Sequence, residues 1–125
     1  MADSRAVFDN DAQCALLTFT GFLTTAQFIV IAEEAHTLRQ KHNSCKQLNN
    51  IEDMKVLTQE IQTWLKETWF PKALQTGLKY FAFVIPKNVL GMMSMKNANN
   101  QSEETGIDIK YFDNEIEAKK WLKSK

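Results

Sequence analysis

Proline, glycine, cysteine and histidine are all scarce in this sequence, and neither sign of charge is in excess. The 125 residues include two prolines, four glycines, two cysteines and two histidines, and 15 basic residues balance 15 acidic ones. Because the formal net charge is zero, electrostatics gives no reason to expect binding to nucleic acid or to an anionic membrane. The few glycines have neither dinucleotide-binding nor P-loop spacing.

Long apolar runs are also missing. No run approaches the roughly 20 residues that cross a bilayer, and the start of the chain, MADSRAVFDNDAQ, lacks the charged-then-apolar pattern of a signal peptide. We therefore expect a cytoplasmic protein with no integral membrane segment. The length and a hydrophobic content of 44% are those of one globular domain, residues 1–125, that buries about two-thirds of its unfolded surface.

Groups that could bind a metal or act in catalysis are few. Cys14 and Cys45 are far from any CxxC spacing, and we expect them to be reduced thiols on strands. His36 and His42 are six residues apart, which places them on different faces of one predicted helix, so we expect ordinary surface histidines. No third group completes a nucleophile–base arrangement around Cys45 or Ser94. The sequence predicts no metal, no cofactor and no catalytic residue.

The first third of the chain predicts a β-hairpin followed by an amphipathic helix. The segments RAVF and CALLTFT are strand-like, and FDNDAQ between them is rich in turn formers. Thr24 and Gln27 have capping-box spacing, so a helix should begin there and run to His42. Its expected buried stripe is Phe28, Ile31, Ala32, Ala35 and Leu38, with Glu33, Glu34, Arg39 and Lys41 in solvent.

The rest of the chain alternates strands and helices. In order, the predicted elements are a strand over 45–51, a helix capped by Thr58, a buried strand over 78–85, a short helix and polar loop over 87–100, a half-exposed strand over 106–112, and a last helix capped by Asp113 or Asn114. The order β-β-α-β-α-β-α-β-α predicts an α/β fold. Its sheet should be mixed but mostly parallel, with packed helices and an N-terminal hairpin.

This order and several local strings resemble the STAS fold, and within it the SpoIIAA-like family of small bacterial proteins. The strings are GFLTTAQF, WFPKALQTGLKYFAFVIP and YFDNEIEAKKWLKS, and the resemblance extends over nearly the whole chain. It implies a domain that is not an enzyme and that binds partner proteins. In the anti-sigma-factor antagonists of this fold, a serine at the start of the helix after the third strand is phosphorylated to abolish binding. Some relatives resemble lipid-binding CRAL-TRIO proteins, which implies a small apolar ligand as the alternative.

The segment that corresponds to this switch departs from the family pattern. It reads LNNIEDMKVLTQE and contains neither an Asp-Ser pair nor a following glycine. Thr58 is the hydroxyl in a comparable place, and an N-cap role explains it without phosphorylation. Asn49, Asn50 and Asp53 are the other candidates for a switch or an interaction site. The two asparagines need hydrogen-bond partners if buried, and turn formation is the simpler explanation for both.

The segment TWLKETWFPKALQTG contains two tryptophans, a phenylalanine and a proline. Pro71 cannot donate a hydrogen bond and disfavours helical angles at the residue before it, so we expect the helix to kink or restart near Phe70. We expect one aromatic side chain to pack there and another to stay partly exposed. The possible lining of an apolar groove or interface comprises Trp64, Trp69, Phe70, Met92, Met93 and Met95.

The function expected from these observations is non-enzymatic protein interaction, with a regulatory role, an unidentified protein partner and a possible homodimer. The alternative is a carrier or sensor of a small apolar, lipid-like ligand held by the aromatic and methionine side chains. The two differ in one observable feature, because the ligand function requires a continuous apolar cavity.

Overall fold

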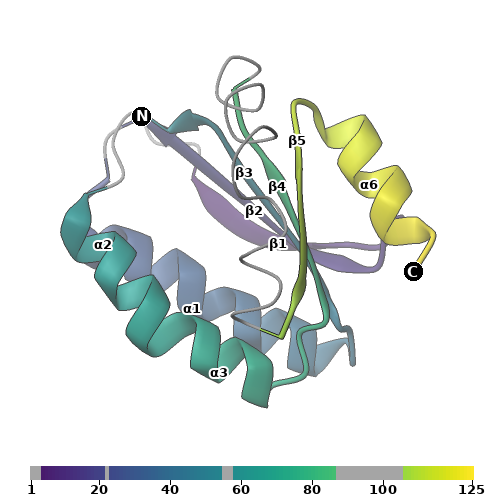
Figure 1. The fold of residues 1–125 in the computed structure, drawn as a ribbon, viewed down its shortest axis with the longest axis horizontal. Coiled ribbons are helices and arrows are strands. Elements are labelled where there is room, and N and C mark those ends of the chain that lie inside the picture. Colours follow the sequence, from purple (N-terminus) through teal and green to yellow (C-terminus); the bar gives the residue numbers. More distant parts are fainter. Residues whose placement is uncertain (1–3, 22, 55–57, 87–105) are drawn as a thin grey trace.

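The computed structural model describes residues 4–21, 23–54, 58–86 and 106–125, and these form one mixed sheet with helices on both faces (Figure 1). The strands lie in the order β1-β2-β3-β4-β5; β1 and β2 are antiparallel, and the remaining neighbours are parallel. The strands are β1 (Arg5–Asp9), β2 (Cys14–Gly21), β3 (Lys46–Met54), β4 (Tyr80–Val84) and β5 (Asp108–Phe112). The helices are α1 (Thr25–Lys41), α2 (Gln59–Trp64), η1 (Leu65–Trp69), α3 (Phe70–Gln75) and α6 (Glu115–Lys123).

The predicted order of elements is confirmed for the described residues, and two predicted caps are confirmed in detail. Thr24 and Gln27 form a reciprocal capping box at the start of α1. Of the two candidates at the last helix, Asn114 is the N-cap, because its side chain accepts from the backbone N–H of Glu117. The predicted helix and loop over 87–100 lie outside the described residues.

Helices α1, α2 and α3 cover one face of the sheet, and α6 covers the other (Figure 1). Because successive side chains of a strand point to opposite faces of the sheet, the apolar core consists of two clusters, one on each face. The larger cluster, under α1 to α3, includes Leu17, Phe19, Phe28, Ala32, Ile61, Trp69 and Phe81. The smaller cluster, under α6, includes Cys14, Leu48, Ala82, Val84, Ala118 and Leu122.

Strand β3 is longer than the predicted 45–51 and is the middle strand of the sheet. It begins at Lys46 and continues to Met54, whereas its last register pair with β4 is Asn50 with Val84. The prediction that Asn49 and Asn50 form a turn is therefore wrong. Both lie inside the strand, where polar partners on opposite faces of the sheet satisfy their side chains.

The restart predicted near Phe70 is confirmed, because α3 begins at Phe70 with Pro71 in its first turn. The predicted departure of Phe70 from helical angles is wrong, because the chain stays helical through Pro71. Phe70 has φ −64° and ψ −42°, and its N–H donates to the carbonyl of Leu65, five residues earlier. A proline ring clashes with the carbonyl four residues before it in a regular α-helix. The wider π-turn of η1 accommodates the proline and joins α2, η1 and α3 into one continuous helix.

The π-turn directs Trp69 into the core beneath α1. Its side chain is 1% exposed, and its indole N–H donates to the carbonyl of Ala32 at 2.8 Å. The ring stacks on His36 with centroids 5.0 Å apart and lies 5.3 Å from the Phe81 ring. Phe70 is only half-buried, so one aromatic side chain packs and its neighbour is partly exposed, as the sequence predicted.

We expect Trp69→Phe to lower the free energy of unfolding by about 1–3 kcal/mol, because it removes a buried hydrogen bond and leaves a small cavity. Trp64→Phe is the matched control, since Trp64 is half-buried, and its cost should stay below about 1 kcal/mol. Urea unfolding followed by circular dichroism measures both. Equal costs would contradict the central role of Trp69.

Candidate functional site

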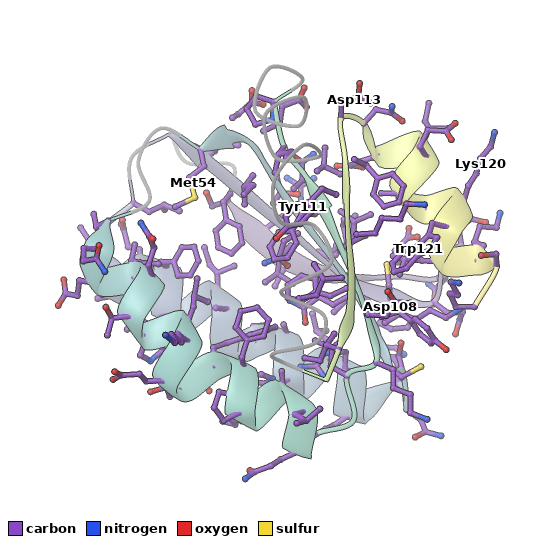
Figure 2. All side chains as sticks on the ribbon, in the orientation of Figure 1. Met54, Asp108, Tyr111, Asp113, Lys120 and Trp121 are labelled. Atoms are coloured by element: carbon purple, nitrogen blue, oxygen red, sulfur yellow. The ribbon has the colours of Figure 1, made fainter. Side chains whose placement is uncertain are left out.

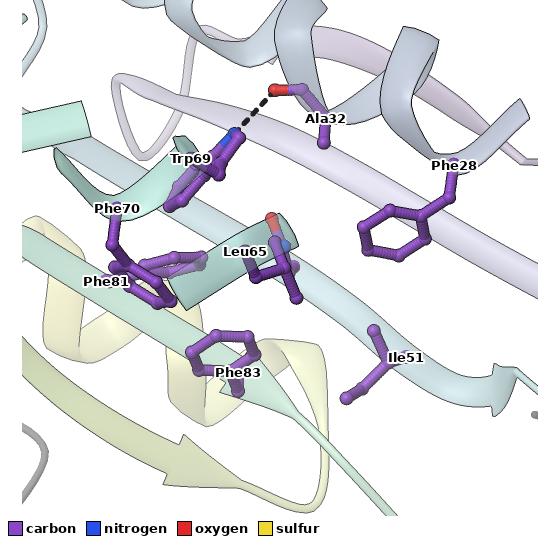
Figure 3. Close-up of a pocket in the computed structure, with 9 residues that line it drawn as sticks. Phe28, Ala32, Ile51, Leu65, Trp69, Phe70, Phe81 and Phe83 are labelled. Carbon is purple, nitrogen blue, oxygen red and sulfur yellow. Dashed lines mark hydrogen bonds between the residues drawn. The ribbon is translucent and has the colours of Figure 1, made fainter. Parts of the chain in front are cut away.

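A small apolar cavity lies between the helices of the larger core and the sheet face of β3 and β4 (Figure 3). Its volume is about 50 Å³. The lining comprises Phe28, Ala32, Asn49, Ile51, Leu65, Trp69, Phe70, Phe81 and Phe83. Eight of these nine side chains are apolar, and Asn49 is the one polar group in the lining.

Stacked aromatic rings make up the sheet side of the cavity. The Phe81 and Phe83 ring centroids lie 4.2 Å apart, and Phe83 stacks in turn on Tyr111 at 5.3 Å. A site that encloses a drug-sized ligand has a volume of about 300–1,000 Å³. The present cavity is several times smaller, so it accommodates a group of only a few heavy atoms.

A buried polar network begins at Asn49 and ends under α1. The Asn49 Oδ1 accepts from Gln47 Nε2 at 2.9 Å, and Gln47 Oε1 accepts from Arg39 Nε at 3.0 Å. The Arg39 guanidinium also donates from Nη1 to Thr76 Oγ1 at 3.2 Å and lies 2.6 Å, through Nη2, from His36 Nδ1. The predictions that His36 lies at the surface and that Arg39 lies in solvent are therefore wrong.

Arg39 is fully buried, and the hydrogen-bond partners given above are all uncharged. It lies in the last turn of α1 and donates to Thr76, the C-cap of α3, so two helix C-termini direct partial negative charge toward it. Burial lowers the pKa of the Arg39 guanidinium to about 10, which leaves the group charged at neutral pH. Hydrogen bonds and helix dipoles thus replace a carboxylate as the means of stabilising this charge.

His36 is neutral in this environment. Burial, followed by the positive charge of Arg39, lowers the pKa of the imidazole to about 4. An uncharged Nδ1 can accept from Arg39, and the proton then resides on Nε2. Within the described part of the chain, His36 Nε2 is buried and has no hydrogen-bond partner. This histidine is therefore a neutral acceptor and not a proton-transfer group.

The four candidate switch residues do not form one site. Asn49 faces the cavity, whereas Asn50 is on the opposite face of the sheet and donates to Glu115 Oε2 at 2.6 Å. Asp53 is exposed near the end of β3. Thr58 is the N-cap of α2, as predicted, with its Oγ1 accepting from the N–H of Ile61 at 3.2 Å.

The candidate groove residues do not all line one site either. Trp69 and Phe70 line the cavity, but Trp64 is not among its lining residues and packs edge-on against Phe28. Met92, Met93 and Met95 lie outside the described residues. Two of the predicted groove residues, Trp69 and Phe70, thus line a cavity whose sheet side is formed by Ile51, Phe81 and Phe83.

Sequence analysis missed His36, Arg39 and Gln47, the polar core of this site. A signal was present, because Ala32, Ala35, His36 and Arg39 follow the i, i+3, i+4, i+7 spacing of a buried helix face. The polar character of the last two residues concealed this pattern. No comparable signal identifies Gln47 as their partner.

A second feature, which we name the acidic edge, lies where β3 and β5 end and α6 begins. In Figure 2, Met54 marks the end of β3, and Asp113 directly follows the end of β5. Ile116 is 70% exposed there, and the hydrogen bond between Asn50 and Glu115 fixes the start of α6 against β3. The acidic edge comprises Glu52, Asp53, Asp113, Glu115, Ile116 and Glu117.

The described residues hold little that resembles a catalytic or metal site. No group of three or more His, Cys, Asp or Glu side chains among them is placed to hold a metal ion. Burial raises the pKa of the Cys14 thiol to about 12, which keeps it protonated and unreactive. Within the same ranges, no helix has the length and apolar character of a membrane span.

No protein-family model matches the sequence, and no curated protein matches it either. A solved structure does match: an uncharacterised protein of the DUF3478 family with a SpoIIAA-like fold from Shewanella loihica PV-4. The TM-score is 0.59 at 14% identity, and the match covers 97% of this chain and 93% of that one. The chain therefore has the SpoIIAA-like, STAS-like fold that its sequence resembles. This fold is typically non-enzymatic.

We expect the stability of the protein to fall as the pH drops from 6.5 toward 4. The folded pKa of His36 lies below its ordinary value of 6.5, so acid protonates the unfolded chain first and favours unfolding. The free energy of unfolding should decrease by on the order of 2 kcal/mol between pH 7 and pH 5.

Urea unfolding at a series of pH values measures this loss. His36→Gln keeps an acceptor for Arg39 but cannot titrate, so most of the pH dependence should disappear in that variant. His42→Gln, which changes an exposed histidine, should retain it. Identical pH profiles for His36→Gln and the wild type would contradict the assignment.

Proposed function

We propose that this protein is a non-catalytic interaction module and that a partner protein docks on the acidic edge. The observation that carries the proposal is the 70% exposed Ile116, which stands between Glu115 and Glu117 at the capped start of α6. An exposed apolar side chain beside charged groups offers both contact area and electrostatic selectivity for a complementary surface.

The charges of the acidic edge favour a basic partner. The acidic edge includes five carboxylates, and two of them form ion pairs within α6: Glu115 with Lys119 at 3.9 Å and Glu117 with Lys120 at 3.6 Å. Asn114 caps the helix, and Asn50 holds Glu115, so the surface is ordered before any partner arrives. A preordered surface loses less conformational entropy on binding.

The chemistry of the described side chains supports a non-catalytic role. His36 is neutral, buried and committed to Arg39, and Cys14 is a protonated buried thiol. Neither has the accessible, activated character of a general base or a nucleophile. Two free cysteines agree with a reducing cytoplasm, where we propose that the protein acts.

Thr58 is better explained as a cap than as a switch. Its hydroxyl already satisfies the first turn of α2, and Glu60 in that turn accepts a hydrogen bond from Thr25 at 2.8 Å. A phosphate on Thr58 would add negative charge beside Glu60 and would compete with that link between α1 and α2. We therefore place recognition on the acidic edge and not on Thr58.

The experiment compares Ile116→Lys with Val30→Lys as immobilised bait in lysate of the source organism. Val30 on α1 is also 70% exposed, so the two substitutions are matched in chemistry and exposure. Wild type and Val30→Lys should retain the same partner, whereas Ile116→Lys should retain at least about tenfold less, since it loses a central apolar contact and repels a basic surface. Retention of an identical set by all three proteins would contradict docking at the acidic edge.

The second candidate function is binding of a small apolar ligand, and the aromatic cavity is the observation that favours it. At about 50 Å³ the cavity is too small for a lipid chain, which is why we rank this function second.

Native mass spectrometry of gently purified protein tests the ligand function. A bound ligand should add mass to the wild type and to Val30→Trp, but Ile51→Trp, which fills the cavity, should carry none. A bare mass for the wild-type protein would remove this function.

A further inference from the structure

Strand β1 forms one outer edge of the described sheet. Among the strands that the structure describes, β1 lies at one end of the sheet and has β2 as its only neighbour. Natural proteins protect edge strands by several means, among them short length, proline and charged side chains, especially lysine. The five residues of β1, RAVFD, include no proline or lysine and have a charge at each end, and Val7 at their centre is 40% exposed.

The side chains of β1 alternate between the two faces of the sheet. Ala6 and Phe8 face α1, where Phe8 stacks on His42 with centroids 3.8 Å apart. Arg5, Val7 and Asp9 face the side that carries α6, and Asp9 approaches Lys119 of that helix at 3.7 Å. The face that α6 does not fully cover therefore presents a positive, an apolar and a negative residue in a row.

A two-fold axis perpendicular to the sheet and passing by Val7 would make two β1 strands antiparallel. In that register residue 5 of one copy lies opposite residue 9 of the other, and residue 7 lies opposite itself. Arg5 would then face Asp9 of the second copy at both ends, with two valines in contact at the axis. Each of these cross-strand pairs is favourable.

The Asp9 carboxylate has room for a further partner. It accepts from the N–H of Ala12 through Oδ2 at 2.9 Å, while the contact of Oδ1 among the described residues is the long one of 3.7 Å with Lys119. The formal net charge of the chain is zero, so two copies approach without overall repulsion.

The other end of the sheet lacks this self-complementarity. The same operation on β5 would centre on Lys110, so that two exposed lysines would face each other across the axis. Like charges directly opposite one another are destabilising, and an exposed lysine is a common protection of an edge strand. Of the two end strands in the described part of the sheet, β1 is therefore the one that suits a second copy.

We propose that the protein forms a homodimer through antiparallel pairing of β1 with β1 of a second copy, which joins the two sheets into one. The interface is distinct from the acidic edge, so dimerisation and partner docking can occur together. The proposal does not depend on the function proposed above.

Charge substitutions at Val7, the residue on the two-fold axis, test the proposed dimer. In Val7→Lys two lysines would meet at the axis, and in Val7→Asp two aspartates would meet. Each variant should therefore be monomeric at concentrations at which the wild type is dimeric. An equimolar mixture should dimerise again, because lysine then faces aspartate. Ile116→Lys, a change on the acidic edge, should remain as dimeric as the wild type.

Sedimentation velocity over a range of concentrations measures the association, with circular dichroism as a check that each variant is folded. The expected result is a rise of at least tenfold in the dimer dissociation constant for each Val7 variant, reversed in the mixture. A monomeric wild type at all concentrations, dimeric Val7 variants, or a mixture that stays monomeric would each overturn the proposal.

An independent variant reports on the register directly. Antiparallel neighbours directly opposite each other have Cα atoms about 4.5–5.5 Å apart, within the range that a disulfide spans. Val7→Cys should therefore form a disulfide-linked dimer on mild oxidation, and Ile116→Cys should not. Equal crosslinking of the two variants would overturn the register.

Discussion

The Trp69 indole connects the helical layer to the sheet, and most of the larger core is arranged around it. Its N–H donates to the carbonyl of Ala32 in α1, its ring stacks on His36, and the Phe81 ring of β4 lies against it at a tilt of 47°. The π-turn exists because Pro71 cannot continue a regular α-helix, and that wider turn directs Trp69 inward. A local constraint on one proline thus determines how two layers of the protein meet.

Beside this ring lies a buried cation whose observed partners are all uncharged. Isolated charges in protein interiors cost several kcal/mol unless hydrogen bonds satisfy them. Arg39 has neutral acceptors on three separate elements and lies at two helix C-termini. Burial and, after it, the same positive charge lower the pKa of the neighbouring His36 and keep it neutral. The polar interior and the apolar cavity meet at Asn49, which belongs to both.

Much of the fold could be predicted from the sequence because it depends on local signals. Capping residues, strand alternation and the apolar run of β4 are readable one segment at a time. The errors occurred where partners distant in sequence decide the outcome. Arg39 appeared to be a surface charge because Gln47 and Thr76, which bury and satisfy it, cannot be identified without the fold. Two consecutive asparagines are typical of a turn. They fit in strand β3 because Gln47 on one face and Glu115 on the other supply their hydrogen bonds, and neither partner can be identified without the fold. Trp69 and Phe70, two of the predicted groove residues, line the cavity, but its sheet-side lining could not be identified without the strand register.

The contacts of Arg39 also discriminate against wrong pairings of the central strand. A slip of β3 by one residue would move Gln47 and Asn49 to the face of α6 and would bring Leu48 beneath the guanidinium. The Arg39 charge would then remain buried without its acceptor Gln47. The free-energy cost of that loss is larger than the cost of an apolar mismatch at the same place. A misregistered sheet would therefore be rejected at this position during folding. The buried Arg39 guanidinium, which is costly to place in the core, thus disfavours misregistered alternatives.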